Sequence, residues 1–135
     1  MSKKIYVNLP VSDLARSIAF YQAVGYSINE KWTDETAACV VISEDIHAML
    51  LTHARFSDFT PNEICNAKQQ TEVLLALGCE SRDEVDELVR KAVAAGGNTY
   101  NEPQDHGFMY GHGYQDPDGH IWEVFYMDPA AVEST

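Results

Sequence analysis

Two segments of this 135-residue chain repeat one pattern, and that repeat constrains the fold more than any other feature. Residues 45–51 and 118–124 both read Asp-x-His followed by an apolar run, and residues 25–30 and 97–102 both read Gly-x-x-x-Asn-Glu. Two copies are too few for a solenoid, so we expect two halves that pack as a pseudo-symmetric pair. Where the second copy carries Glu123, this alignment places Leu50 in the first.

Each half begins with a strand pattern that is followed by a helix pattern. Apolar residues alternate over 4–11, as expected of a strand with one buried face, and 71–77 is a second strand in which both faces are largely apolar. Ser12 is an N-cap candidate for the first helix, and Ser81 opens a capping box for the second. In the first half two or three strands follow the helix, and those at 37–43 and 46–52 are the clearest; in the second half two strands are predicted within 98–115 and one at 120–127. The order is therefore βαβββ, given twice.

Two βαβββ modules predict an α+β fold with a curved mixed sheet, helices on its convex face and a concave ligand cleft. We expect one domain over 1–135, with module one at about 4–53 and module two at about 71–128. The connector, residues 54–70, breaks the repeat. Its Thr60-Pro-Asn-Glu capping box predicts a short helix that runs to about Lys68. We interpret this segment as a link, with a lid or a dimer contact as alternatives.

Charge and cysteine usage exclude some classes of partner. Nine basic residues against 21 acidic ones give a net charge of −12, which argues against nucleic acid and anionic membranes as partners. A cationic ligand and a plainly solvated surface both fit this charge. Three cysteines without metal-type spacing indicate reduced thiols and a cytoplasmic protein. No apolar run is long enough to span a bilayer.

Short motifs in both halves resemble those of the vicinal oxygen chelate superfamily, which includes glyoxalase I, bleomycin-resistance proteins and extradiol dioxygenases. They are residues 9–13, Ser17 and 20–25 in the first half, and 116–123 in the second. Within the superfamily the chain looks most similar to proteins related to lactoylglutathione lyase. The resemblance implies a small-molecule ligand and a homodimer. In members that are metal enzymes, it also implies a divalent ion such as Mg, Mn, Ni or Zn.

The resemblance also implies where metal ligands would lie. By position they fall on Tyr6, Leu50, Glu72 and Glu123, but leucine cannot bind metal and tyrosine must first lose its proton. The expectation is a weak half-site of Glu72 and Glu123, either holding an ion loosely or empty. These carboxylates are also the candidate catalytic residues, because a carboxylate on an apolar strand face is costly to bury without a purpose.

Strand alternation and the aromatic, Gly-rich segment before the last strand extend the expected pocket. Its predicted members are Tyr6, Asn8, Leu50, Thr52, Tyr110, His112, Ile121 and Phe125. His47 and His120 occupy matching places after turns, and we interpret both as structural residues at strand ends.

Two small-molecule functions remain open at this point, beside a third hypothesis in which the domain acts mainly through dimerisation or a protein partner. One is a glyoxalase-related protein that has lost two of four ligand positions and is therefore not a standard glyoxalase I; as an enzyme it would be a lyase, isomerase or transferase. The other is a metal-free binding or sequestration protein of the bleomycin-resistance type. The resemblance then implies an acidic dimer that binds a cationic drug.

Overall fold

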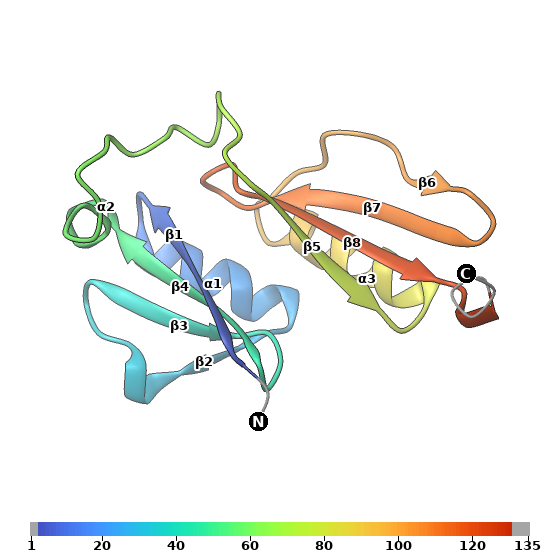
Figure 1. Ribbon diagram of the computed structural model, residues 1–135, viewed down its shortest axis with the longest axis horizontal. Helices are drawn as coiled ribbons and strands as arrows, with labels where there is room; N and C mark the ends of the chain where they lie inside the picture. Colours follow the sequence, from blue (N-terminus) through green and yellow to red (C-terminus); the bar gives the residue numbers. More distant parts are fainter. Residues whose placement is uncertain (1–2, 131–135) are drawn as a thin grey trace.

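The computed structural model describes residues 3–130, and the predicted βαβββ order is confirmed in both halves (Figure 1). The expected domain, 1–135, also includes residues 1–2 and 131–135, which lie outside the described residues. Module one contains β1 (Ile5–Val11), α1 (Leu14–Val24), β2 (Ser27–Asn29), a 3₁₀ turn (Glu30–Trp32), β3 (Ala37–Val41) and β4 (Ile46–Thr52). Module two contains β5 (Leu74–Cys79), α3 (Arg82–Ala94), β6 (Gln104–Asp105), β7 (Met109–Gln115) and β8 (Ile121–Met127).

Each module forms its own four-stranded mixed sheet among the described residues. The strand orders are β1-β4-β3-β2 and β5-β8-β7-β6. In both sheets the first strand of the module runs parallel to the last, and the other neighbours are antiparallel. The parallel pair requires a crossover, which α1 and α3 begin. The α+β class is therefore confirmed, with two sheets that lie side by side (Figure 1).

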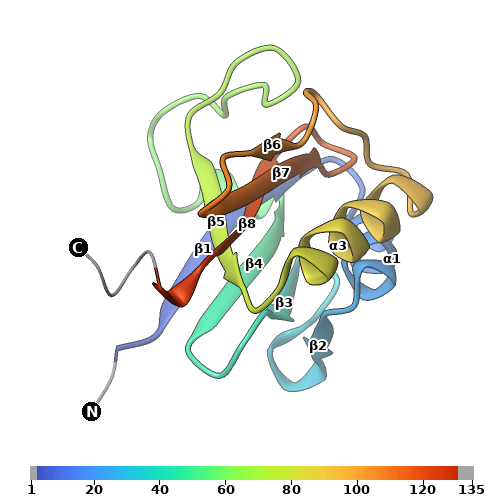
Figure 2. The same ribbon diagram turned by 90° about the vertical axis from the view of Figure 1, so that its right-hand side faces the viewer.

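The two modules share a hydrophobic core between the sheets and the helices. α1 and α3 contact each other on the same side of the sheets (Figure 2). Phe20 and Val24 of α1 are buried in the same cluster as Val85 and Val89 of α3. Burying one apolar stripe from each helix against the other module stabilises both, because neither sheet alone covers its apolar face.

The first helix begins one residue later than predicted. Asp13, not Ser12, is the N-cap, and its carboxylate accepts a hydrogen bond from the Arg16 amide at 3.1 Å. The Ser12 amide instead donates to Asp118 of module two at 2.9 Å, so a tertiary contact displaces the expected cap. At α3 the predicted cap is confirmed, because Ser81 Oγ accepts from the Glu84 amide at 3.0 Å.

The predicted connector helix after Thr60 is wrong. A short helix, α2 (His53–Ser57), instead follows β4 directly, and the Thr52 side chain caps it. The Thr60 hydroxyl accepts from the amide of Asn62 at 3.1 Å, only two residues ahead. Such a local side-chain turn competes with helix formation. The connector then runs without helix or strand until β5 begins at Leu74.

Strand pairing shows that the repeat alignment at Leu50 is wrong by one residue. Leu9 pairs with Leu50 in module one, and Leu77 pairs with Val124 in module two; all but the half-buried Leu77 are buried in the core. Because successive side chains on a strand point to opposite faces, Met49 and not Leu50 corresponds to Glu123.

A buried carboxylate joins the two modules. Asp116, 2% exposed, accepts a hydrogen bond from the Tyr21 hydroxyl at 2.7 Å, and that hydroxyl accepts from Trp122 Nε1 at 2.9 Å. Asp116 also accepts from the amides of Asp118 and His120, which closes the turn before β8. Burial raises the pKa of Asp116, and it raises that of Tyr21 well above the ordinary value.

Replacing Tyr21 by Phe removes the hydroxyl that bridges Asp116 and Trp122. We expect Tyr21→Phe to lower the free energy of unfolding by about 1–3 kcal/mol, because a buried carboxylate and a buried indole N–H each lose a partner. Chemical denaturation measures this. Tyr126→Phe is the matched control, since the half-buried Tyr126 shows no hydroxyl hydrogen bond to a described residue. Equal losses in both variants would contradict this role for Tyr21.

Candidate ligand-binding site

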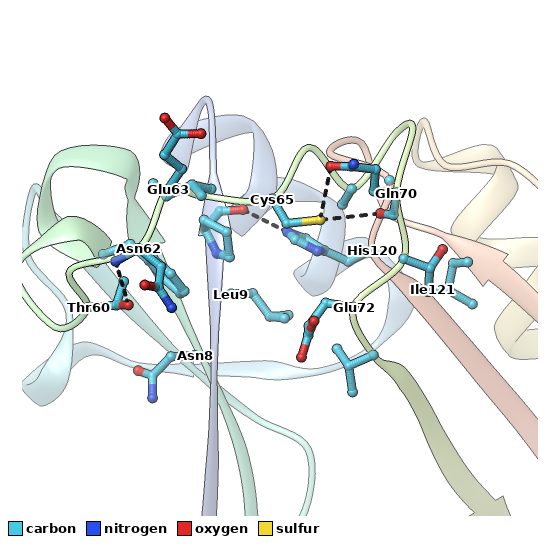
Figure 3. A pocket seen from close by; sticks show the side chains of 17 residues that line it. Asn8, Leu9, Thr60, Asn62, Glu63, Cys65, Gln70, Glu72, His120 and Ile121 are labelled. Atoms are coloured by element: carbon cyan, nitrogen blue, oxygen red, sulfur yellow. Dashed lines mark hydrogen bonds between the residues drawn. The ribbon is translucent and has the colours of Figure 1, made fainter.

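A cavity of about 370 Å³ lies between β1, the connector and the turn before β8 (Figure 3). We call it the connector cavity. Its volume is in the range that holds small molecules. The residues lining it are Asn8, Leu9, Pro10, Phe56, Thr60, Asn62, Glu63, Ile64, Cys65, Ala67, Gln70, Thr71, Glu72, Val73, Gly119, His120 and Ile121. It therefore draws on both modules and on the irregular segment that joins them.

Two close contacts hold the walls of this cavity together. His120 Nε2 lies 2.7 Å from the carbonyl oxygen of Pro10, and it must be the donor because a carbonyl oxygen only accepts. Gly119 has a φ of +95°, and a Cβ there would lie 2.8 Å from the carbonyl oxygen of Ala67. Only glycine meets both conditions, so this turn lets the connector backbone approach β8 closely.

The lining of the connector cavity is acidic and rich in amides. Glu63 and Glu72 contribute carboxylates, and none of the described lining residues is a lysine or an arginine. Figure 3 shows Glu72 beside Leu9, below Cys65 and His120, whereas Glu63 points outward at the edge. Such a lining favours a ligand that carries positive charge or hydrogen-bond donors.

A second cavity of about 390 Å³ lies on the sheet of module two, and we call it the Glu123 cavity. Phe125, Glu123 and His112 line it, and His112 Nε2 lies 3.1 Å from the carbonyl oxygen of Asn101. A third cavity, of about 250 Å³ on module one, includes Tyr6 and His47; we call it the His47 cavity. Five of the eight expected pocket residues are therefore divided among three cavities, with Asn8 and Ile121 in the connector cavity.

Three residues expected in the pocket have other roles. Leu50 is fully buried in the core, on the helix side of its sheet. Tyr110 also faces the helices: its hydroxyl donates to Asp86 of α3 at 2.5 Å, and the Arg82 guanidinium lies 5.2 Å from its ring centre. Thr52 caps α2. The sequence gives the polarity of each of these residues. Which face of the sheet its side chain occupies depends on strand register and on where the strand ends.

The two carboxylates of the expected half-site line different cavities. Glu72 precedes β5 and lies in the connector cavity, whereas Glu123 lies in mid-β8. Counted back from the helix caps Asp13 and Ser81, the residue that corresponds to Tyr6 is Leu74, and these two are 50% and 54% exposed. The four corresponding positions are thus Tyr6, Met49, Leu74 and Glu123.

That donor set does not fit a hard divalent ion. A phenol, a thioether and a leucine leave Glu123 as the one good oxygen ligand, and Mg²⁺ or Mn²⁺ needs several. Within residues 3–130, no group of three or more His, Cys, Asp and Glu side chains could hold a metal ion.

Tyr100 is a site residue that the sequence did not single out. It lines the Glu123 cavity, and its phenol oxygen occupies the space where a side chain at Gly113 would lie. Gly113 pairs with Glu123 across the sheet, so the phenol lies close to that carboxylate. Burial, followed by the charge of Glu123, raises the pKa of Tyr100. Gly113 was the available signal, because a glycine inside a strand often marks close approach of another group.

Comparison with known proteins agrees with this geometry. Residues 5–124 match the model of the Glyoxalase/Bleomycin resistance protein/Dioxygenase superfamily. The chain belongs to this superfamily. The match spans both modules and the connector, so the resemblance to the vicinal oxygen chelate proteins is confirmed at the level of the superfamily. No curated protein matches the chain.

Several solved structures share the fold. A hypothetical protein from S. aureus is 29% identical, with a TM-score of 0.78 over 93% of this chain and 94% of that one. A superfamily enzyme from Burkholderia phytofirmans PsJN is 21% identical, with a TM-score of 0.78 over 93% and 99%. A bleomycin resistance determinant encoded on transposon Tn5 is 16% identical, with a TM-score of 0.64 over 93% and 98%.

Within the described part of this chain, no helix is both long and apolar enough to span a membrane.

The titration of Tyr100 tests whether Glu72 and Glu123 lie in separate sites. We expect Glu123→Gln to lower the pKa of Tyr100 toward its ordinary value, because the neighbouring negative charge that opposes ionisation is gone. Glu72→Gln should leave the titration unchanged, because Glu72 lines the other cavity. NMR of the assigned ring protons against pH measures both. A matching shift in the two variants would show that the carboxylates share one site.

Proposed function

We propose that this protein binds a small cationic molecule in the connector cavity, without a metal ion. The observation that carries the proposal is the position of Glu72: a carboxylate at the wall of a cavity whose described lining has no lysine or arginine. The net charge of −12 adds a long-range attraction for cations. This is the sequestration function expected for a bleomycin-resistance type, in a member that we place in the cytoplasm because its three cysteines are free thiols.

The ligand positions argue against the glyoxalase I reaction. The resemblance to the superfamily implies that this reaction needs a divalent ion to stabilise an enediolate. Met49 and Leu74 supply no oxygen or nitrogen at two of the four positions, so the residues of this chain do not support such a step.

A second candidate function is proton transfer in the Glu123 cavity. Glu123 and Tyr100 are adjacent there, and a carboxylate beside a phenol is a workable pair of base and acid. Under this alternative Glu123 is the catalytic residue, and Glu72 has a secondary role in binding the substrate. A lyase, isomerase or transferase of the superfamily would fit this arrangement.

Binding of cationic aromatic compounds tests the first proposal. A compound held at a hundred times its Kd should stabilise the protein by about 2.7 kcal/mol in thermal unfolding, with or without a chelator. Glu72→Gln should weaken binding about two- to fivefold, the contribution of one solvent-accessible ion pair. Glu35→Gln is the control, because Glu35 is exposed and lies outside the cavity. Stabilisation that disappears with chelator, or equal weakening in the two variants, would contradict metal-free binding at Glu72.

We also propose a homodimer that covers the first strands of the two modules. Ile5, Tyr6, Val73 and Leu74 are apolar or aromatic, and each is about half exposed. β1 and β5 are edge strands of their sheets, where unpaired backbone groups invite another strand.

An exposed edge of this kind predicts association in solution. We expect a dimer mass by light scattering, and we expect Leu74→Lys to shift the equilibrium toward monomer because a charge would have to be desolvated at the contact. Val93→Lys is the control, since Val93 is a similarly exposed apolar residue on α3. A monomeric wild-type protein would overturn the proposed dimer.

A further inference from the structure

Soft donor atoms gather on the open face of the sheet in module one. Cys39 of β3 lies directly opposite Met49 of β4. His47 lies two residues before Met49 on the same strand, so both point to the same face, away from the core around Leu50. Opposite residues in an antiparallel pair bring their Cβ atoms within about 5.5 Å, and diagonal neighbours remain within reach of long side chains. Cys39, His47 and Met49 line the same cavity of about 250 Å³.

His47 is buried there without a hydrogen bond at one ring nitrogen. Its side chain belongs to a residue only 7% exposed, and Nδ1 has no hydrogen-bond partner among the described residues. The ring of Tyr6 stacks on the imidazole at 4.6 Å between centres. A buried polar atom without a partner costs free energy, so this nitrogen requires an explanation that packing alone does not provide.

We propose that Cys39, His47 and Met49 bind a soft monovalent cation, of which Cu(I) and Ag(I) are the representatives. Thiolate and thioether sulfur select such ions, and imidazole completes a three-coordinate site. As the metal–sulfur bond forms, the thiol proton of Cys39 leaves to solvent, and no oxidation or reduction takes place. The site lies outside the connector cavity, and it does not depend on the function proposed for that cavity.

The rest of the His47 cavity suits this ion better than a hard one. No carboxylate is among its described lining residues, which add only Asn29, Trp32 and Tyr6 to the three donors. The aromatic side chains of Trp32 and Tyr6 line the cavity beside the donors. Mg²⁺ or Ca²⁺ would lose its preferred oxygen ligands in such a site.

Titration with Ag(I) in chloride-free buffer tests the proposal on the full chain. The parent is Cys65→Ser/Cys79→Ser, which removes the exposed and half-buried thiols that would bind the ion elsewhere. We expect one ion per chain by calorimetry. Cys39→Ser should remove this binding, and His47→Gln and Met49→Leu should each weaken it at least tenfold.

Met49→Leu keeps nearly the same volume, so it tests the sulfur atom even if the other variants fold poorly. Circular dichroism and the thermal midpoint without metal establish that each variant is folded. Undiminished binding in folded Met49→Leu, or no stoichiometric binding in the parent, would overturn the site. Retained binding in folded Cys39→Ser would do the same, because the ion would then rest on other groups.

Discussion

The arrangement of the two modules depends on the hydrogen bonds that the buried carboxylate of Asp116 accepts. This carboxylate lies in the turn before β8, it is held by Tyr21 of α1, and through that hydroxyl it is linked to Trp122. Burial raises its pKa, so the charged form costs stability, and the hydrogen bonds to Tyr21 and to two backbone amides offset that cost. The same turn places Gly119 and His120 against the connector and Pro10. One charged group therefore fixes both the core and a wall of the connector cavity.

Strand register decides which side chains can do chemistry in this fold. The repeated Asp-x-His suggested that Leu50 and Glu123 are equivalent, but pairing with the first strand of each module makes Met49 the counterpart of Glu123. A shift of one residue moves a side chain from the open face to the core. His47 and His120 diverge for the same reason: one lies on the open face of β4, and the other bonds to the Pro10 carbonyl before β8 begins.

The connector is the segment whose structure could not be predicted from the sequence. The modules have periodic apolar patterns, so their strands and helices were predictable, and Ser81 was identified as a cap. The connector has no such periodicity, and a local turn at Thr60 replaced the expected helix. The connector cavity is built largely from this irregular segment, so its residues, apart from Asn8, Glu72 and Ile121, were not foreseen. Tyr100 was not predicted because it lies in a loop, and its contact with Gly113 of β7 is a tertiary contact that strand periodicity does not indicate.

The sequence by itself determined the two βαβββ modules and membership of the superfamily, because hydrophobic periodicity and a repeated motif depend only on local order along the chain. It also marked Glu72 and Glu123 as unusual. Only the tertiary structure decided that these carboxylates line separate cavities, and that His47, Met49 and Cys39 share another. The physical reason is that such groupings depend on strand register and on the path of an irregular connector, which long-range packing and the Asp116 contacts set.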